Sequence, residues 1–88
     1  MSPRYEVRID KETLRALERL DGPLRRRVVK RIDGLAAEPR PGGGKALQGE
    51  HRGLYRVQVG DVRVVYAVRD GELLVLVVRV GHRGDVYR

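Results

Sequence analysis

The sequence predicts a two-layer α+β domain, in which an N-terminal strand and a two-helix hairpin pack on a mainly antiparallel sheet of four to five strands. Two observations predict this fold class. Apolar side chains recur at helical spacing between residues 11 and 35, and from residue 54 onward they follow the period of strands joined by tight turns. Helices followed by a run of strands are typical of such domains. The 88 residues fit a single domain, which we assign to residues 1–88.

The first predicted elements are a strand and a helix. Tyr5–Ile9, "YEVRI", alternates between apolar and polar residues, which is typical of a half-buried strand. Asp10 then offers an N-cap for a helix over Lys11–Leu20. The apolar face of this helix, which we expect to lie on the sheet, consists of Leu14, Leu17 and Leu20.

A second helix is predicted after a break at Asp21–Pro23, because Pro23 suits the first turn of a helix. Its apolar stripe consists of Leu24, Val28, Ile32 and Leu35. The segment that follows, Glu38–Lys45, holds three consecutive glycines beside Lys45. It lacks the Ser or Thr that follows the lysine of a phosphate-binding P-loop, since Ala46 stands there. We therefore interpret the segment as a linker.

The second half of the chain predicts three strands. Leu54–Val59, Val62–Val68 and Leu73–Val80 are separated by short turns at Gly60–Asp61 and Arg69–Glu72, which predicts an antiparallel meander. The last of these strands is apolar on both faces. Strands of that kind are buried on both sides, so we expect it to lie in the interior of the sheet.

Several cations are predicted on the uncovered face of this sheet. Side chains alternate across a strand, and the apolar set must face the helices. Arg56, Gln58 and Arg63 therefore project from the opposite face, and the last strand adds Arg79 and then Arg83. An open face with several guanidiniums indicates an anion site, whereas the alternative is a set of solvated arginines with no ligand.

Composition narrows the partners and the compartment. Nineteen Lys and Arg against twelve acids give a net charge of +7, which favours a polyanion such as nucleic acid or an acidic protein segment. The alternative is that the protein comes from an Arg-rich proteome, in which surface arginines serve only solubility.

Cys is absent, and no His, Asp and Glu residues have metal-ligand spacing, so we expect no disulfide, metal or cofactor. No signal peptide or membrane span is recognisable, and we expect a soluble cytoplasmic protein without a membrane partner.

Two stretches of the sequence carry a specific combination of motifs. "LYRVQVGDVRVVYAV" and the closing "VVRVGHRGDVYR" combine Tyr-Arg, Gly-Asp-x-Arg-x-x-Tyr and Gly-His-Arg…Val-Tyr patterns. Together they resemble the RelE/ParE toxin superfamily of type II toxin–antitoxin systems. Upstream, "LDGPLRRRVVKRIDGLAAEPRPGGGKALQG" resembles the helical hairpin of the family, its Pro-Arg loop and its Lys-x-Leu-x-Gly segment that enters the sheet. The resemblance covers nearly the whole chain.

The resemblance implies a RelE-like fold and a toxin. RelE-type members cut messenger RNA in the ribosomal A site without a metal, which inhibits translation. ParE-type members instead inhibit DNA gyrase without nuclease activity, and this is our alternative. Both types are neutralised by a cognate antitoxin. The expected partners are therefore the antitoxin and messenger RNA on the ribosome, with operator DNA bound only through the antitoxin complex.

The resemblance also assigns roles to individual residues. The sequence departs from well-studied RelE-type members in two places. Gln58 stands where they have a lysine, and the sequence ends at Arg88, where they often continue into a C-terminal helix.

The expected reaction needs cations and a group that moves protons. Cations suit the extra negative charge on phosphorus, whereas proton transfer needs a group such as His or Tyr. We expect the catalytic residues to be Arg56, Arg63, Arg83, Tyr87 and His82, and the nucleic-acid-binding residues to be Lys45, Arg52, Gln58 and Arg79.

Overall fold

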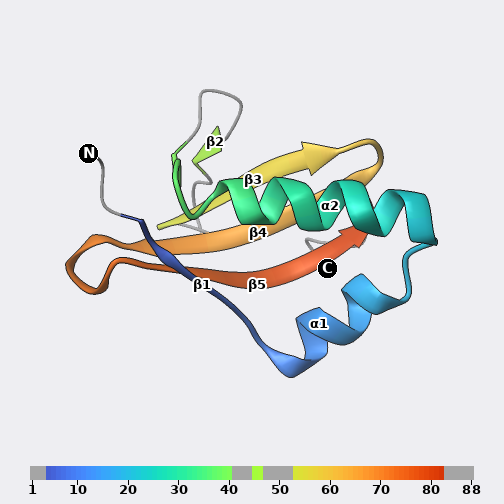
Figure 1. The fold of residues 1–88 in the computed structure, drawn as a ribbon, viewed down its shortest axis with the longest axis horizontal. Helices are drawn as coiled ribbons and strands as arrows, with labels where there is room; N and C mark the ends of the chain where they lie inside the picture. The colour runs from blue at the N-terminus through green and yellow to red at the C-terminus, as the bar shows by residue number, and fades with distance from the viewer. Residues whose placement is uncertain (1–3, 41–44, 47–52, 83–88) are drawn as a thin grey trace.

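The computed structural model describes residues 4–40, 45–46 and 53–82. Its five strands form one sheet in the order β1-β5-β4-β3-β2, and two helices lie against one face of it (Figure 1). The elements in chain order are β1 (Glu6–Ile9), α1 (Lys11–Glu18), α2 (Gly22–Gly34), β2 (Lys45–Ala46), β3 (Leu54–Val59), β4 (Val62–Arg69), the 3-10 turn η2 (Asp70–Glu72) and β5 (Leu74–His82). The predicted α+β fold class is confirmed.

The N-terminal strand lies beside the C-terminal one. β1 pairs with β5 in parallel, while every other pair of neighbouring strands in the described chain is antiparallel. β5 thus lies between β1 and β4, which confirms its predicted interior position and explains why Val75 and Val77 are fully buried. The strand continues to His82, two residues beyond its predicted end.

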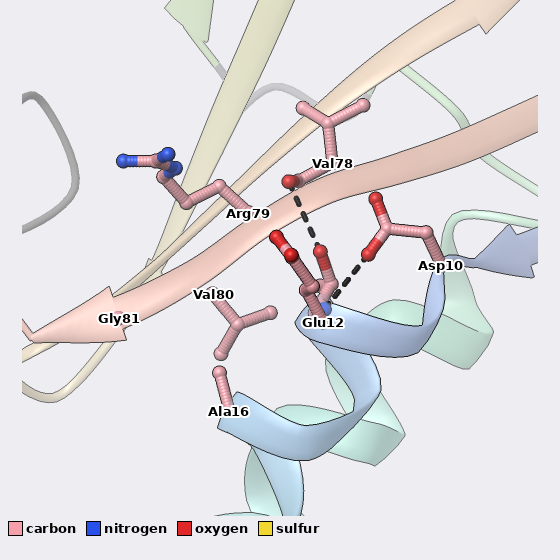
Figure 2. Close-up of a pocket in the computed structure, with 8 residues that line it drawn as sticks. Asp10, Glu12, Ala16, Val78, Arg79, Val80 and Gly81 are labelled. Carbon is pink, nitrogen blue, oxygen red and sulfur yellow. Dashed lines mark hydrogen bonds between the residues drawn. The ribbon is translucent and has the colours of Figure 1, made fainter.

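Helix α1 is fixed at its start by two hydrogen bonds. The Asp10 carboxylate accepts from the Thr13 backbone N–H at 2.7 Å, which confirms the predicted N-cap and lowers the pKa of Asp10. The buried Thr13 hydroxyl donates to the Val78 carbonyl oxygen of β5 at 3.0 Å (Figure 2). The predicted face of this helix was wrong at one position. Leu14 is 44% exposed, because Thr13 and Leu17 take the positions that face the sheet.

Helix α2 supplies most of the helical share of the core. Its stripe residues Val28 and Ile32 are almost completely buried, as is Leu35 directly after the helix. They pack with Leu17 and Leu20 against the inner face of β3, β4 and β5. The predicted hairpin of apolar stripes on a sheet is therefore confirmed. Neither helix of the described residues is long and apolar enough to cross a membrane.

The segment interpreted as a linker ends in a short strand. Lys45 and Ala46 form β2 and pair with Arg56 and Tyr55 of β3. The linker interpretation was therefore wrong at Lys45, because the open edge of β3 offers backbone donors and acceptors that this segment satisfies. The predicted turn before the last strand forms η2, and Leu73 leaves it in a left-handed conformation with φ 50°.

Candidate nucleic-acid interface

The face of the sheet opposite the helices gathers polar side chains from three strands. In one cross-strand row, Arg56 of β3 lies opposite Val65 of β4, which lies opposite Arg79 of β5. In the next row, Gln58 lies opposite Arg63. Side chains that are directly opposite in an antiparallel pair have Cβ atoms about 5 Å apart. The predicted placement of Arg56, Arg63 and Arg79 on one open face is confirmed.

Arg63 lies partly enclosed on this open face. It is half-buried, and its Nε atom is shielded from solvent. Its partner on β5 is Gly81, which carries no side chain. Its partner on β3, Gln58, is oriented by a hydrogen bond that its amide donates to the Gly60 carbonyl oxygen at 2.9 Å. Arg63 thus lies between a glycine and an oriented amide in its cross-strand row.

Val65 gives the open face an apolar centre. Strand alternation predicts its position on this face, yet the side chain is only 3% exposed. Arg56, which is half-buried, and Arg79, which is exposed, flank it in the same row. The Arg79 side chain extends away from α1 (Figure 2). An apolar floor lowers the local dielectric, so an anion bound between these arginines is attracted more strongly than it is in water.

His82 does not share this face. It pairs with Val62, whose side chain belongs to the core on the helix side of the sheet, whereas Arg63 pairs with the adjacent Gly81. The register therefore places His82 on the side opposite Arg63, and its role in catalysis stays a prediction. Arg52, Arg83 and Tyr87 lie outside the described residues, as does the side chain of Lys45, although the Lys45 backbone lies opposite Arg56. The described cluster consists of Arg56, Gln58, Arg63 and Arg79.

Within the described residues, no three His, Asp or Glu side chains come together in a group that can hold a metal ion. The open face presents guanidiniums and an amide instead. Both kinds of group can donate hydrogen bonds to phosphate oxygens, and the guanidiniums also carry positive charge. The planar fork of Arg matches two of those oxygens at once.

A polar network at the other end of the sheet was not predicted from the sequence. Arg40 makes two hydrogen bonds of 2.9 Å to the carboxylate of Asp70, and it lies over the ring of Tyr55 with 5.3 Å to the ring centroid. The Tyr5 hydroxyl donates to the same carboxylate at 2.6 Å. These contacts tie the segment after α2 to the turn between β4 and β5. Because they join residues 30 and 65 positions apart, no local pattern signals them.

The network predicts a pH dependence of stability. Hydrogen bonds from Arg40 and then from Tyr5 lower the pKa of Asp70 from 3.8 to about 2. A carboxylate whose pKa is lowered by folding contributes stability above its unfolded pKa, and this contribution is lost as the pH falls through the folded value. We expect Asp70→Asn to unfold at lower urea than the parent at neutral pH, and the difference to close between pH 3.8 and pH 2. Urea midpoints measured across this range check it, and an offset that stays constant with pH contradicts it.

Comparison with known proteins places the chain among toxins. A family model described as the ParE toxin of the type II toxin–antitoxin system parDE matches residues 7–87. The chain is 32% identical over 84 residues to a Mycobacterium tuberculosis protein named toxin RelE, and the match covers 96% of this chain and 87% of that protein. It is also 34% identical over 85 residues to toxin RelG of the same organism, and this match covers 96% of this chain and 97% of RelG.

A solved structure has the same fold. The toxin–antitoxin complex RelBE2 from Mycobacterium tuberculosis contains a chain that superposes with a TM-score of 0.82 and 31% identity. The match covers 91% of this chain and 99% of that one. The two chains therefore share one fold, and the similar chain was solved in a toxin–antitoxin complex.

Proposed function

Because the chain belongs to the RelE/ParE family and is a toxin of a type II toxin–antitoxin system, we propose that it is a metal-free, ribosome-dependent messenger RNA endoribonuclease that inhibits translation. The observation that carries the proposal is the register of β3, β4 and β5, which gathers Arg56, Arg63 and Arg79 on the open face. A surface of guanidiniums around an apolar centre suits the phosphodiester backbone of RNA.

The proposed reaction is a transfer of phosphorus from one oxygen to another. The ribose 2′-oxygen attacks the adjacent phosphorus and loses its proton, and the bond from phosphorus to the 5′-oxygen breaks. The 5′-oxygen takes up a proton, so the products carry a 2′,3′-cyclic phosphate and a 5′-hydroxyl. Negative charge rises on the phosphoryl oxygens in the transition state. Arg56 and Arg63 are assigned to these oxygens, because preorganised cations stabilise charge that develops there.

The remaining assignments concern proton transfer and binding. Arg stays protonated and is a poor base. Arg83 is assigned to the phosphate, and Tyr87 either moves a proton or stacks on an unpaired base. His82 is kept as a candidate for proton transfer, although its pairing with Val62 places it on the helix side of the sheet. The residues assigned to RNA binding beside the reacting phosphate are Lys45, Arg52, Gln58 and Arg79.

The proposed protein partner is a cognate antitoxin. The similar Mycobacterium tuberculosis chain was solved in a toxin–antitoxin complex. A net charge of +7 favours an antitoxin segment that is acidic where it covers this chain. Operator DNA is assigned to the complex with the antitoxin rather than to this chain alone.

The second candidate function is inhibition of DNA gyrase without nuclease activity. It is favoured by the description of the matching family model, which is that of a ParE toxin. The two functions predict different damage in a growing cell, so one experiment separates them.

The test is to induce the chain in growing cells, with Arg63→Ala as the matched control, and to map RNA 5′ ends and plasmid supercoiling in the same samples. A nuclease produces new 5′ ends within translated reading frames and leaves supercoiling unchanged at early times. Growth arrest with intact messages and relaxed plasmid contradicts the proposal and supports gyrase inhibition.

A further inference from the structure

A second cationic surface lies on the helix side of the molecule. A groove of about 480 Å³ runs between α2 and the tip of the β3–β4 hairpin. We call it the α2 groove. Its lining residues are Arg27, Lys30, Arg31, Gly34, Gln58, Val59 and Gly60.

The charge of the α2 groove is positive throughout. Arg27, Lys30 and Arg31 have i, i+3 and i+4 spacing, so they share one face of the helix. No lining residue is acidic. The ion pairs Arg8–Glu6 and Arg40–Asp70 lie elsewhere in the described part of the chain. Like charges three and four residues apart on a helix destabilise it slightly. The three cations therefore do not stabilise the helix through one another. An anionic ligand would remove their mutual repulsion.

The groove has open space where side chains are absent. Gly34 lies at the end of α2, and a Cβ atom built there meets nothing within 4 Å. Gly60 turns the hairpin at φ +59°, and Arg27 Nη1 lies 4.0 Å from the position that its Cβ would take. A ligand that enters the groove therefore meets the Arg27 guanidinium beside bare backbone.

The α2 groove is continuous with the open face at Gln58. This residue lines the groove, and it also lies opposite Arg63 in the cross-strand row of the open face. Gln58 therefore belongs to both surfaces, and a polyanion that contacts this residue lies next to the cations of each.

We propose that the α2 groove binds the phosphodiester backbone of RNA at nucleotides outside the phosphate that is cleaved. The inference deepens the proposed function and rests on it for the identity of the polyanion. An acidic protein helix is the competing ligand. Protein interfaces require apolar anchors at their centre, and the one large apolar side chain of this groove, Val59, is only 8% exposed. A positively charged groove that follows a backbone is the typical surface for single-stranded nucleic acid.

The test compares two double variants in an Arg63→Ala background, so that RNA is bound without being cut. Arg27→Glu/Lys30→Glu reverses two cations of the groove. Arg15→Glu/Arg26→Glu reverses two exposed cations outside it and changes the net charge equally. The probe is a fluorescein-labelled oligouridylate, and its anisotropy gives the affinity over a range of salt concentrations.

The groove variant is expected to bind roughly tenfold or more weakly than the control variant, with a salt slope smaller by about 1.4, since each phosphate contact to a single strand contributes about 0.7. Equal affinities and slopes for the two double variants overturn the proposal. If the groove variant loses binding to the antitoxin but not to the oligouridylate, the groove belongs to the antitoxin and the proposal fails. Because no cleavage is measured, these outcomes are independent of whether the chain proves to be a nuclease.

Discussion

Arg63→Ala is expected to abolish growth inhibition while the protein remains folded. The side chain lies on the open face, opposite Gln58 and Gly81, and it is not a member of the hydrophobic core cluster. Loss of one preorganised donor to a developing oxyanion lowers the rate of the chemical step by about 10²–10³-fold. A toxin that has lost this much activity no longer outpaces the synthesis of new messages, so we expect colony counts to return to those of an uninduced culture.

Two further variants separate a role of Arg63 in activity from a role in the fold. Arg63→Lys retains the charge and most of the stem but not the planar fork, so we expect partial activity and parental stability. Arg15→Ala removes an exposed arginine of α1 and is expected to leave toxicity unchanged. Circular dichroism and thermal melts report the fold of each variant. If Arg63→Ala is folded and as toxic as the parent, the assigned role is ruled out. If Arg63→Ala and Arg63→Lys both unfold, the Arg63 side chain is needed for the fold.

Tyr66→Ala is expected to cost about 3–5 kcal/mol of the free energy of unfolding, which is typical for removal of a fully buried aromatic ring. Tyr66 is fully buried in the centre of the core, and its ring stacks on Tyr55 with 5.8 Å between centroids. Its hydroxyl donates to the Pro39 carbonyl oxygen at 2.9 Å, and burial raises its pKa. Because a domain of this size is stabilised by only about 4–13 kcal/mol, we expect the variant to be close to unfolding at 37 °C.

Tyr66→Phe is the matched control for the hydroxyl group. It keeps the ring and removes only the hydrogen bond to Pro39, so we expect a loss of about 1–2 kcal/mol. Urea unfolding of the three proteins separates the contribution of the ring from that of the hydroxyl. Equal losses for the two substitutions contradict this account, because they assign the whole effect to the hydrogen bond.

Strand alternation was the most informative pattern in the sequence. It placed Arg56, Gln58 and Arg63 on one face and Tyr66 with the core valines on the other, and the structure has this arrangement. Alternation is reliable here because a slip of one residue would exchange a buried valine for an arginine. The N-cap at Asp10 was equally predictable, since a carboxylate before a helix has a local partner.

The features that sequence patterns missed depend on contacts between distant segments. The ion pair of Arg40 with Asp70 joins two turns whose approach is determined by the whole sheet. The burial of Val65 on the open face has no local signal either, since strand alternation assigns a face and not a degree of exposure. The α2 groove combines helix cations with a hairpin tip, and only the packing of α2 on β3 brings them together.

The most direct measurement of the central claim is cleavage of a defined message on purified ribosomes. Ribosomes stalled with an empty A site are incubated with the protein or with Arg63→Ala, and the ends of the RNA are then analysed. We expect cleavage in the A-site codon by the parent alone, with a 2′,3′-cyclic phosphate on the upstream fragment and a 5′-hydroxyl on the downstream one. Intact message with the parent protein, or equal cleavage by Arg63→Ala, contradicts the claim that the arginine face is a nuclease site.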